Sequence, residues 1–281
     1  MIIDTHIHIW DLKRAAYDWL KDDTSILNRT YQLEELLPSF SPAKVTQGVL
    51  VQAANNMEDT GFMLETARNH DQITGVVGWL PLKDPVKTLG ILNEKLLKEK
   101  YFKGVRHLIH NEPDPAWLLQ PEVLESLQIL AMHNIPYDVV GINDDHLQTA
   151  IKVSEKIPDL KIVLDHLNQP PIAEKKRFGR WGELMKAIAG NSNVYAKISG
   201  LGTASGNLTG WTADDVRPYM AYTLELFGAK RCFCGGDWPV SLLAGSYENH
   251  WTIYRNILSG LLQEADADLV LHKNAKQFYN L

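Results

Sequence analysis

The N-terminal stretch MIIDTHIHIW, residues 1–10, sets the pattern from which the fold is predicted. Its isoleucines and its length favour a β-strand over residues 2–9. Seven further short runs rich in β-branched and apolar residues follow along the chain, each separated from the next by a longer stretch. These runs cover residues 47–52, 73–79, 103–107, 136–140, 161–165, 194–198 and 231–235. Short strands that alternate with longer segments are typical of parallel β/α units.

The intervening stretches have helical periodicity. In residues 84–98, Val86, Leu89 and Leu92 recur at three-residue steps on one predicted helix face. Similar patterns cover residues 57–69, 120–134, 143–156, 181–189, 213–227, 247–259 and 265–279. Eight strands at a repeat of about 35 residues predict a (β/α)8 TIM barrel. The 281 residues, 1–281, are therefore expected to form a single domain, although the length alone would also allow two.

Three connections stand out by length or composition. Residues 10–31 and 107–119 are longer than an ordinary loop between a strand and a helix. Both follow a predicted strand, so both belong to the face of a barrel where active sites lie. Residues 200–212 are rich in glycine, which predicts a flexible or irregular loop.

Composition and charge exclude several classes of function. Apolar residues make up 45% and charged residues 22% of the chain, which is ordinary for a globular protein. The net charge of −6 gives no attraction to polyanions, so nucleic acid and anionic membranes are not expected partners. We predict a soluble, cytoplasmic protein that binds a small-molecule substrate, with a homo-oligomer left open. Cys232 and Cys234 lie two apart in one strand, which excludes a normal disulfide between them and favours a core role.

The first predicted strand carries two histidines. His6 and His8 lie two residues apart, so their side chains point to the same side of the strand. Two imidazoles placed in this way can bind one metal ion. A pair of core histidines joined by hydrogen bonds would give the same spacing.

Two later strands deliver further ionisable groups to the same edge. His166 follows the sixth strand and Asp237 follows the eighth, which completes a His, His, His, Asp set with His6 and His8. A carboxylate at the end of an apolar strand requires a cation, a donor or a metal, so Asp237 is a candidate site residue, unless it only caps the next helix. Asp165 should point the opposite way from His166, and we interpret it as a supporting group outside the metal ligands.

Other polar and aromatic residues fall near the predicted active face. Arg106 could clamp a substrate oxygen and Lys197 could stabilise an oxyanion, but structural ion pairs explain both equally well. A second group consists of side chains that end strands or lie in the long loops and could contact substrate, although core packing is an alternative for the tryptophans. This group is Trp19, Gln52, His107, His110, Trp117 and Trp238.

Several motifs resemble one known family. They are YDWL (17–20), GVRHLIHNEPDPAWLL (104–119), LDHLNQPPI (164–172), KISGL (197–201), GGDWPV (235–240) and NAKQFYNL (274–281). Together with HIH on the first strand, they resemble the amidohydrolase superfamily, in particular the amidohydrolase-2 branch that contains sugar lactonases of the fucono- and rhamnonolactonase type. The motifs run in order from one end of the chain to the other.

The resemblance implies a metal site formed by His6, His8, His166 and Asp237. Binuclear members of the superfamily use a carboxylated lysine at the end of strand four and a histidine on strand five, and neither is present in this sequence. We therefore expect at most one divalent metal, Zn or Mn, and metal-free catalysis stays open.

Lactone hydrolysis is the function that the resemblance favours. We predict that Asp237 accepts a proton from the attacking water, while His166, Arg106 and Lys197 act beside it. The sequence contains no GxSxG motif, so a covalent serine intermediate is not expected. A metal-dependent decarboxylase of an aromatic or unsaturated acid and a non-catalytic binding protein are the rival hypotheses.

Overall fold

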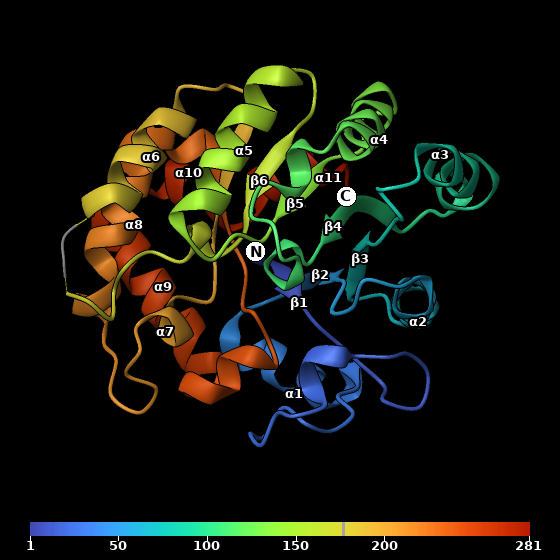
Figure 1. Cartoon of the computed structure of the whole chain (residues 1–281). Helices are drawn as coiled ribbons and strands as arrows, with labels where there is room; N and C mark the ends of the chain where they lie inside the picture. Colours follow the sequence, from blue (N-terminus) through green and yellow to red (C-terminus); the bar gives the residue numbers. More distant parts are fainter. Residues whose placement is uncertain (176–177) are drawn as a thin grey trace.

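The computed structural model describes residues 1–175 and 178–281 and contains eight parallel strands in the order β1 to β8. Helices surround the strands on the outside, as Figure 1 shows. The prediction of a TIM barrel is confirmed, and each strand lies within two residues of its predicted bounds. The strands are β1 Ile3–Ile7, β2 Gln47–Val51, β3 Ile73–Gly78, β4 Phe102–His107, β5 Tyr137–Val139, β6 Ile162–Leu164, β7 Val194–Ile198 and β8 Cys232–Cys234.

The barrel closes between β8 and β1 just beyond the end of β8. The His8 amide donates to the Trp238 carbonyl at 2.7 Å, and the Asp237 amide donates to the His6 carbonyl at 2.7 Å. A bridge between Ile7 and Trp238 lies between these two bonds. The closure therefore joins the backbone of the first-strand histidines directly to that of Asp237.

The helices follow the strands and form the outer layer. They are α1 Leu33–Ala43, α2 Met57–Asn69, α3 Pro85–Glu94, α4 Pro121–Met132, α5 Asp144–Lys156, α6 Gly179–Ala189, α7 Leu201–Ala204, α8 Ala213–Phe227, α9 Tyr247–Leu261, α10 Glu264–Asp268 and α11 Asn274–Tyr279. Two differ from the sequence prediction. The helical stretch predicted over 84–98 ends at Glu94, and the one over 265–279 is divided into α10, a π-helical turn over Leu269–Lys273 and α11.

Helix α1 was not among the predicted helices. It contains Pro38 and Pro42, which remove backbone donors and normally argue against a helix interior. A capping box between Gln32 and Glu35 starts the helix, and Phe40 is among the side chains that it buries. Burial of one face therefore outweighs the cost of the two prolines.

One end of the barrel interior is filled by side chains of the C-terminal helix α11. Phe278 and Tyr279 of α11 pack against side chains from five strands. The cluster consists of Ile3, Val49, Val51, Val77, Val163, Phe233, Ala275, Phe278 and Tyr279. Filling of this kind leaves the opposite end of the barrel for a cavity.

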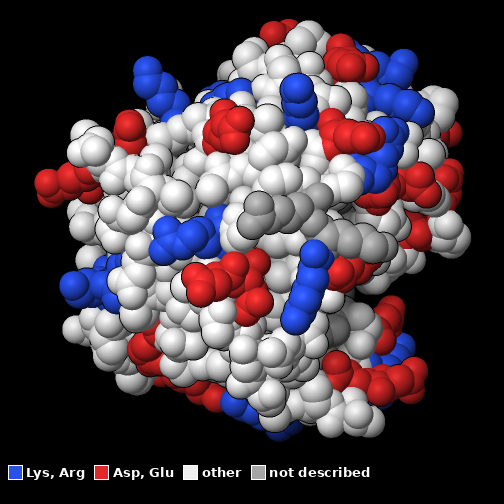
Figure 2. All heavy atoms as spheres, turned by 90° about the vertical axis from the view of Figure 1, so that its left-hand side faces the viewer, with Lys and Arg blue, Asp and Glu red and all other residues white. Residues whose placement is uncertain are grey.

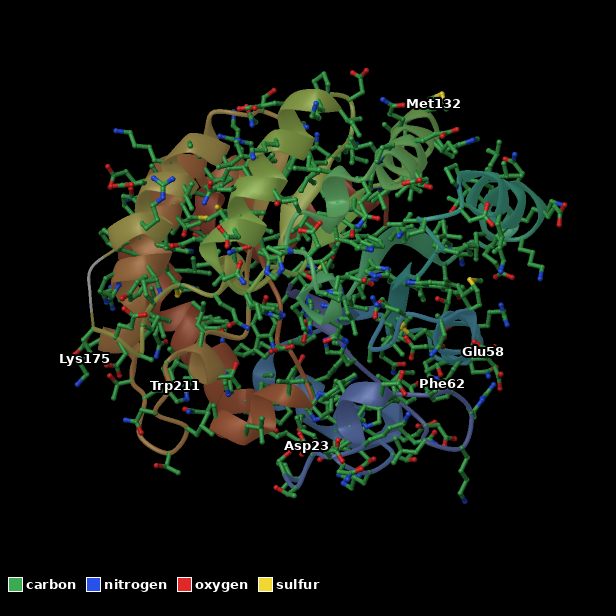
Figure 3. All side chains as sticks on the ribbon, in the orientation of Figure 1. Asp23, Glu58, Phe62, Met132, Lys175 and Trp211 are labelled. Carbon is green, nitrogen blue, oxygen red and sulfur yellow. The ribbon has the colours of Figure 1, made fainter. Side chains whose placement is uncertain are left out.

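The described surface has mixed charge. On the face shown in Figure 2, Lys and Arg side chains are interspersed with Asp and Glu. In Figure 3, Met132 lies at the outer end of α4 and points away from the barrel; it is 72% exposed. Within the part of the chain that the structure describes, no helix combines the length and apolar character needed to cross a bilayer.

Candidate active site

A cavity of about 380 Å³ opens where the strands end. Its wall combines five aliphatic side chains and one tryptophan with seven polar or ionisable ones, and convergent polar groups beside apolar ones are typical of small-molecule sites. The lining residues are His8, Trp19, Ala53, Arg106, Leu108, His110, Val140, Ile142, His166, Gln169, Gly200, Thr203, Asp237 and Val240.

Three imidazole rings surround one carboxylate oxygen at this cavity. His8 and His166 belong to the lining, whereas His6 is fully buried beside them. The Nε2 atoms of His8, His6 and His166 lie 3.6, 3.8 and 3.9 Å from Oδ1 of Asp237. His6 Nε2 and His8 Nε2 are 3.1 Å apart. The His, His, His, Asp set predicted from the sequence therefore converges, although it comes from three different strand ends.

A left-handed backbone conformation at His166 and at Asp237 turns both side chains into the cavity. Strand β6 ends at Leu164, and His166 has φ +52. Asp237 has φ +58, also in the region that non-glycine residues rarely adopt. Gly200 has φ +62, and a Cβ there would lie 2.7 Å from Nδ1 of His166. Unusual backbone of this kind clusters at functional sites.

This geometry corrects the predicted orientation of Asp165. Strand alternation placed Asp165 and His166 on opposite sides, but the strand ends before both residues. Oδ1 of Asp165 lies 3.5 Å from Nδ1 of His6, so Asp165 also points into the barrel interior. Ligand atoms of His6, Asp165 and His166 lie within 4.8 Å of one another.

Burial keeps the histidines neutral. It lowers the pKa of His6 well below 6.5, and burial together with the charge of Arg106 lowers the pKa of His8 to about 3. Burial also lowers the pKa of His166. Nδ1 of His8 lies 2.7 Å from the Val51 carbonyl, which can only accept a hydrogen bond, so Nδ1 carries the proton and Nε2 of His8 keeps its lone pair.

Burial has the opposite consequence for Asp237. It raises the pKa of this carboxyl above the usual 3.8, although interactions with His166 and with the Arg106 guanidinium oppose the effect. A carboxylate with a raised pKa is a stronger proton acceptor than an ordinary aspartate. The position of Asp237 on the cavity wall makes that basicity available to a bound molecule.

Beneath the imidazoles lies a cluster of buried charges. Nζ of Lys197 is 2.6 Å from Oδ2 of Asp138 and 2.8 Å from Oδ1 of Asp165. Arg106 donates to Asp165 at 3.1 Å and to the backbone carbonyl of Gln52. Of the two cations, Arg106 reaches the cavity, whereas Lys197 is fully buried and does not line it. The structural ion pair considered for Lys197 is thus present, and contact with substrate is not supported.

The predicted substrate-binding residues divide into two groups. Trp19 and His110 line the cavity. The Trp19 indole N–H donates to the Ala53 carbonyl at 2.8 Å. Trp19 can therefore contact a ligand through its ring face but not through this donor. The other four are buried and lie outside the described lining, so their contact with substrate stays a prediction: Gln52, His107, Trp117 and Trp238.

Loop packing explains why these four lie behind the wall. The rings of His107 and Trp117 stack with centroids 4.0 Å apart, and His107 lies 2.7 Å from Glu112. The Gln52 amide donates to the Arg106 carbonyl at 3.1 Å. The polar groups of Gln52 and His107 therefore hold the long loops and strand ends in place. Trp238 packs edge-on against Tyr31, with ring centroids 5.4 Å apart.

Some histidines and the glycine-rich loop also differ from expectation. His146 and His250 fall on predicted helices, where the sequence alone favours a surface or capping role. Both are buried instead, and Nε2 of His250 lies 3.0 Å from the Ser241 carbonyl. Trp211, labelled in Figure 3, anchors the end of the 200–212 loop; its indole donates to the Ala244 carbonyl at 2.6 Å. The two cysteines are buried in β8, as predicted.

Several functional candidates were not singled out from the sequence. Gln169 and Thr203 line the cavity, and Asp138 joins the buried charge cluster. Asp4 is fully buried between the first and last strands. A carboxylate within an apolar strand was the available signal for Asp4 and Asp138. Gln169 follows the turn after β6 and Thr203 lies in the short helix α7, and neither position has a comparable signal in the sequence.

The donors present fit one metal ion. His6, His8 and Asp237 each offer one ligand atom within 4.8 Å of the others, all three are buried, and two imidazoles with a carboxylate suit zinc. His6 can ligate through Nε2 when its Nδ1 proton faces Asp165, the arrangement common for metal-bound histidines. Arg106 NH1 lies 3.2 Å from the same Nε2, so metal binding and this hydrogen bond are alternatives.

Comparison with known proteins identifies the family. The amidohydrolase family model matches residues 3–281. The chain belongs to the amidohydrolase family. An L-fucono-1,5-lactonase of Burkholderia ambifaria is 30% identical over 88% of this amidohydrolase and 83% of the relative. An L-fucono-1,5-lactonase of Burkholderia multivorans is 27% identical over 99% of the chain and 96% of the relative.

A solved structure supports the same grouping. An amidohydrolase of Burkholderia multivorans with bound zinc is 27% identical, with a TM-score of 0.90 over 100% of this chain and 99% of that chain. The expected family and barrel are thus confirmed. The presence of zinc in that protein agrees with the donor set described above.

Proposed function

We propose that this amidohydrolase hydrolyses a small lactone, most directly a sugar lactone, by attack of water. The observation that carries the proposal is the Asp237 carboxylate, which has a raised pKa and stands among three neutral imidazoles on a cavity wall. Relatives named as L-fucono-1,5-lactonases support this class of substrate.

Direct attack by water agrees with the side chains that surround the cavity. Among the described lining residues, Thr203 has the one hydroxyl, and it donates to the Gly200 carbonyl at 2.7 Å. Both cysteines are buried in β8, and burial raises the pKa of Cys232 to about 12. These groups are poor nucleophiles, so an activated water is the simpler reagent.

The proton moves through Asp237. Its carboxylate takes a proton from water as the oxygen attacks the lactone carbonyl, and it returns that proton to the ring oxygen when the ring opens. Arg106 lines the cavity and is held by Asp165 and the Gln52 carbonyl, which positions its guanidinium to donate to the developing oxyanion. His166 orients the Asp237 carboxylate from the other side.

His6, His8 and Asp237 would hold a divalent cation, with zinc as the first candidate. When bound, such a cation polarises the lactone carbonyl and favours ionisation of water. The chain's own residues keep their tasks in either case, because Asp237 faces the cavity and Arg106 is fixed beside it.

The charge of the cavity favours a neutral substrate. Arg106 is the one Lys or Arg among the described lining residues, and Asp165 already balances it. Nδ1 of His110 is buried without a hydrogen-bond partner among the described residues, and burial lowers the pKa of His110 to about 4. A neutral His110 suits a sugar hydroxyl. An aromatic acid, the substrate of the rival decarboxylase hypothesis, would find no spare cation among these side chains.

A pH-indicator screen tests the proposal. Purified protein is offered five- and six-membered aldonolactones, with chelator, zinc or manganese, and the Asp237→Asn variant is the matched control. We expect acid release from neutral sugar lactones by the wild type alone. A panel of aromatic acids, monitored for carbon dioxide, runs in parallel. Carbon dioxide release without any lactone hydrolysis would overturn the proposal.

A further inference from the structure

Asp4 of β1 touches the backbone next to both central site residues. Its Oδ1 accepts hydrogen bonds from the amides of His6 at 2.9 Å and Gly236 at 2.7 Å. Its Oδ2 accepts from the Tyr247 hydroxyl at 2.7 Å. Gly236 directly precedes Asp237, so one buried carboxylate contacts the chain at His6 and beside Asp237.

We propose that Asp4 and Tyr247 form a positioning clasp that sets His6 relative to Asp237. Neither residue lines the cavity in the described lining, so both would act through the residues they hold. The inference deepens the proposed function, because it rests on His6 and Asp237 forming the reactive centre.

The clasp lies where the barrel is least regular. Adjacent strands from β1 to β8 are joined by parallel pairing, whereas β8 and β1 have no such ladder among the described residues. Thr5 Oγ1 donates to the Cys234 carbonyl at 2.8 Å, which is a side-chain contact rather than a ladder bond. The Asp4 carboxylate therefore supplies the acceptor that a neighbouring strand supplies elsewhere.

Close packing couples the junction between β8 and β1 to the position of the His6 imidazole. A Cβ at Gly235 would lie 2.5 Å from Cβ of His6, so the turn after β8 presses directly against that residue. A displacement of the turn would move both His6 and Asp237, whose Nε2 and Oδ1 atoms are 3.8 Å apart. Displacements well below 1 Å are enough to impair a catalytic geometry.

Tyr247 ties the clasp to the outer helices. It is the first residue of α9, and its ring stacks on Phe40 of α1 with centroids 6.3 Å apart and an angle of 15°. The ring also packs edge-on against Trp251. The hydroxyl thus approaches Asp4 from a ring that is fixed on two sides, and its removal leaves that packing intact.

Two variants test the clasp. Tyr247→Phe removes one donor and keeps the ring, and Asp4→Asn places an amide where backbone donors need an acceptor. Tyr222→Phe is the matched control, because its hydroxyl donates to the Gly182 carbonyl between outer helices. For both clasp variants we expect kcat on a sugar lactone to fall about 10- to 100-fold with KM unchanged, as for other residues that orient reactive groups. Tyr247→Phe should stay folded, with a melting temperature somewhat below that of the control because Oδ2 of Asp4 loses its donor.

Crystal structures of the variants supply a readout that does not depend on activity. The separation of His6 Nε2 and Asp237 Oδ1 should change in Tyr247→Phe and stay the same in Tyr222→Phe. Unchanged kcat and geometry in Tyr247→Phe would overturn the clasp, as would a lower melting temperature with kcat retained. If the wild type hydrolyses no lactone, the proposed function fails, while the crystallographic comparison still decides the clasp.

Discussion

Asp165 and Asp237 occupy comparable places at the ends of β6 and β8 but lie in opposite electrostatic surroundings. Asp165 is 2.8 Å from Nζ of Lys197 and 3.1 Å from Arg106. Burial alone would raise its pKa, yet Lys197, then His6 and Arg106, hold it well below 3.8. Asp237 has three neutral imidazoles at 3.6 to 3.9 Å, and burial raises its pKa.

The difference shows how one residue type serves two purposes at one edge of a barrel. The positive charges of Lys197 and Arg106 keep Asp165 ionised, and the resulting ion pairs stabilise the barrel interior. Neutral imidazoles and an open cavity leave Asp237 able to take up and release a proton. Each prediction below separates these two roles, from the largest expected effect to the smallest.

Asp237→Asn should produce the largest change in turnover. Loss of the proton acceptor is expected to lower kcat by about 10²- to 10⁴-fold. The free energy of unfolding should not fall, since no lysine or arginine among the described residues pairs directly with this carboxylate. Lactone turnover and urea unfolding are measured on the same preparation. Near-normal turnover would remove Asp237 from the reaction.

Lys197→Met should instead act on stability. The substitution leaves the carboxylates of Asp138 and Asp165 buried beside a single guanidinium. Removing one partner of a buried ion pair typically costs about 3 to 5 kcal/mol in the free energy of unfolding. Urea denaturation measures the loss, with the exposed Lys186→Met on α6 as control. Equal stability of the two variants would show that the charge cluster does not hold the interior.

The pH dependence of turnover should follow Asp237. The ionised carboxylate is the active form, and its pKa is raised above 3.8. On the acidic side of the profile, kcat/KM should therefore fall about tenfold per pH unit, with an apparent pKa above 3.8. The pKa of His8 is about 3, so this imidazole adds no limb near neutral pH. The profile is recorded in chelator, because a bound cation would itself lower the pKa. A limb at or below 3.8 would contradict this assignment.

Trp19→Ala should have the smallest effect. Loss of an aromatic wall typically costs about 0.5 to 1.5 kcal/mol, which corresponds to a KM roughly two- to twelvefold higher. Trp181→Phe is the control, because Trp181 packs between outer helices and donates to the Leu167 carbonyl. The pattern fails if KM is unchanged in Trp19→Ala or rises equally in both variants.

Much of the fold was predictable because the strands are buried runs with a clear composition. Two helices were not predicted. The short α7 lies in the glycine-rich stretch predicted as a loop. For α1, Pro38 and Pro42 argued against a helix, while the capping pair Gln32 and Glu35 was the signal in its favour. The π-helical turn before α11 lies within a pattern that reads as one continuous helix.

The site was predictable where strand ends alone determine it. His6, His8 and Asp237 converge because neighbouring strands end at one edge. The orientation of Asp165 was not predictable, because it depends on a strand that ends at Leu164 and on the positive φ of His166. Loop packing, which places Trp117 against His107 rather than in the cavity, likewise has no signature in a single sequence.

A single turnover in ¹⁸O-labelled water tests the central claim most directly. With enzyme in excess over a sugar lactone, attack by water activated at Asp237 places one ¹⁸O atom in the carboxylate of the first product formed. Mass spectrometry of that product and of the protein distinguishes the outcomes. We predict labelled product and an unlabelled protein. Unlabelled product together with ¹⁸O in the Asp237 side chain would show that Asp237 attacks the substrate itself and would contradict the account.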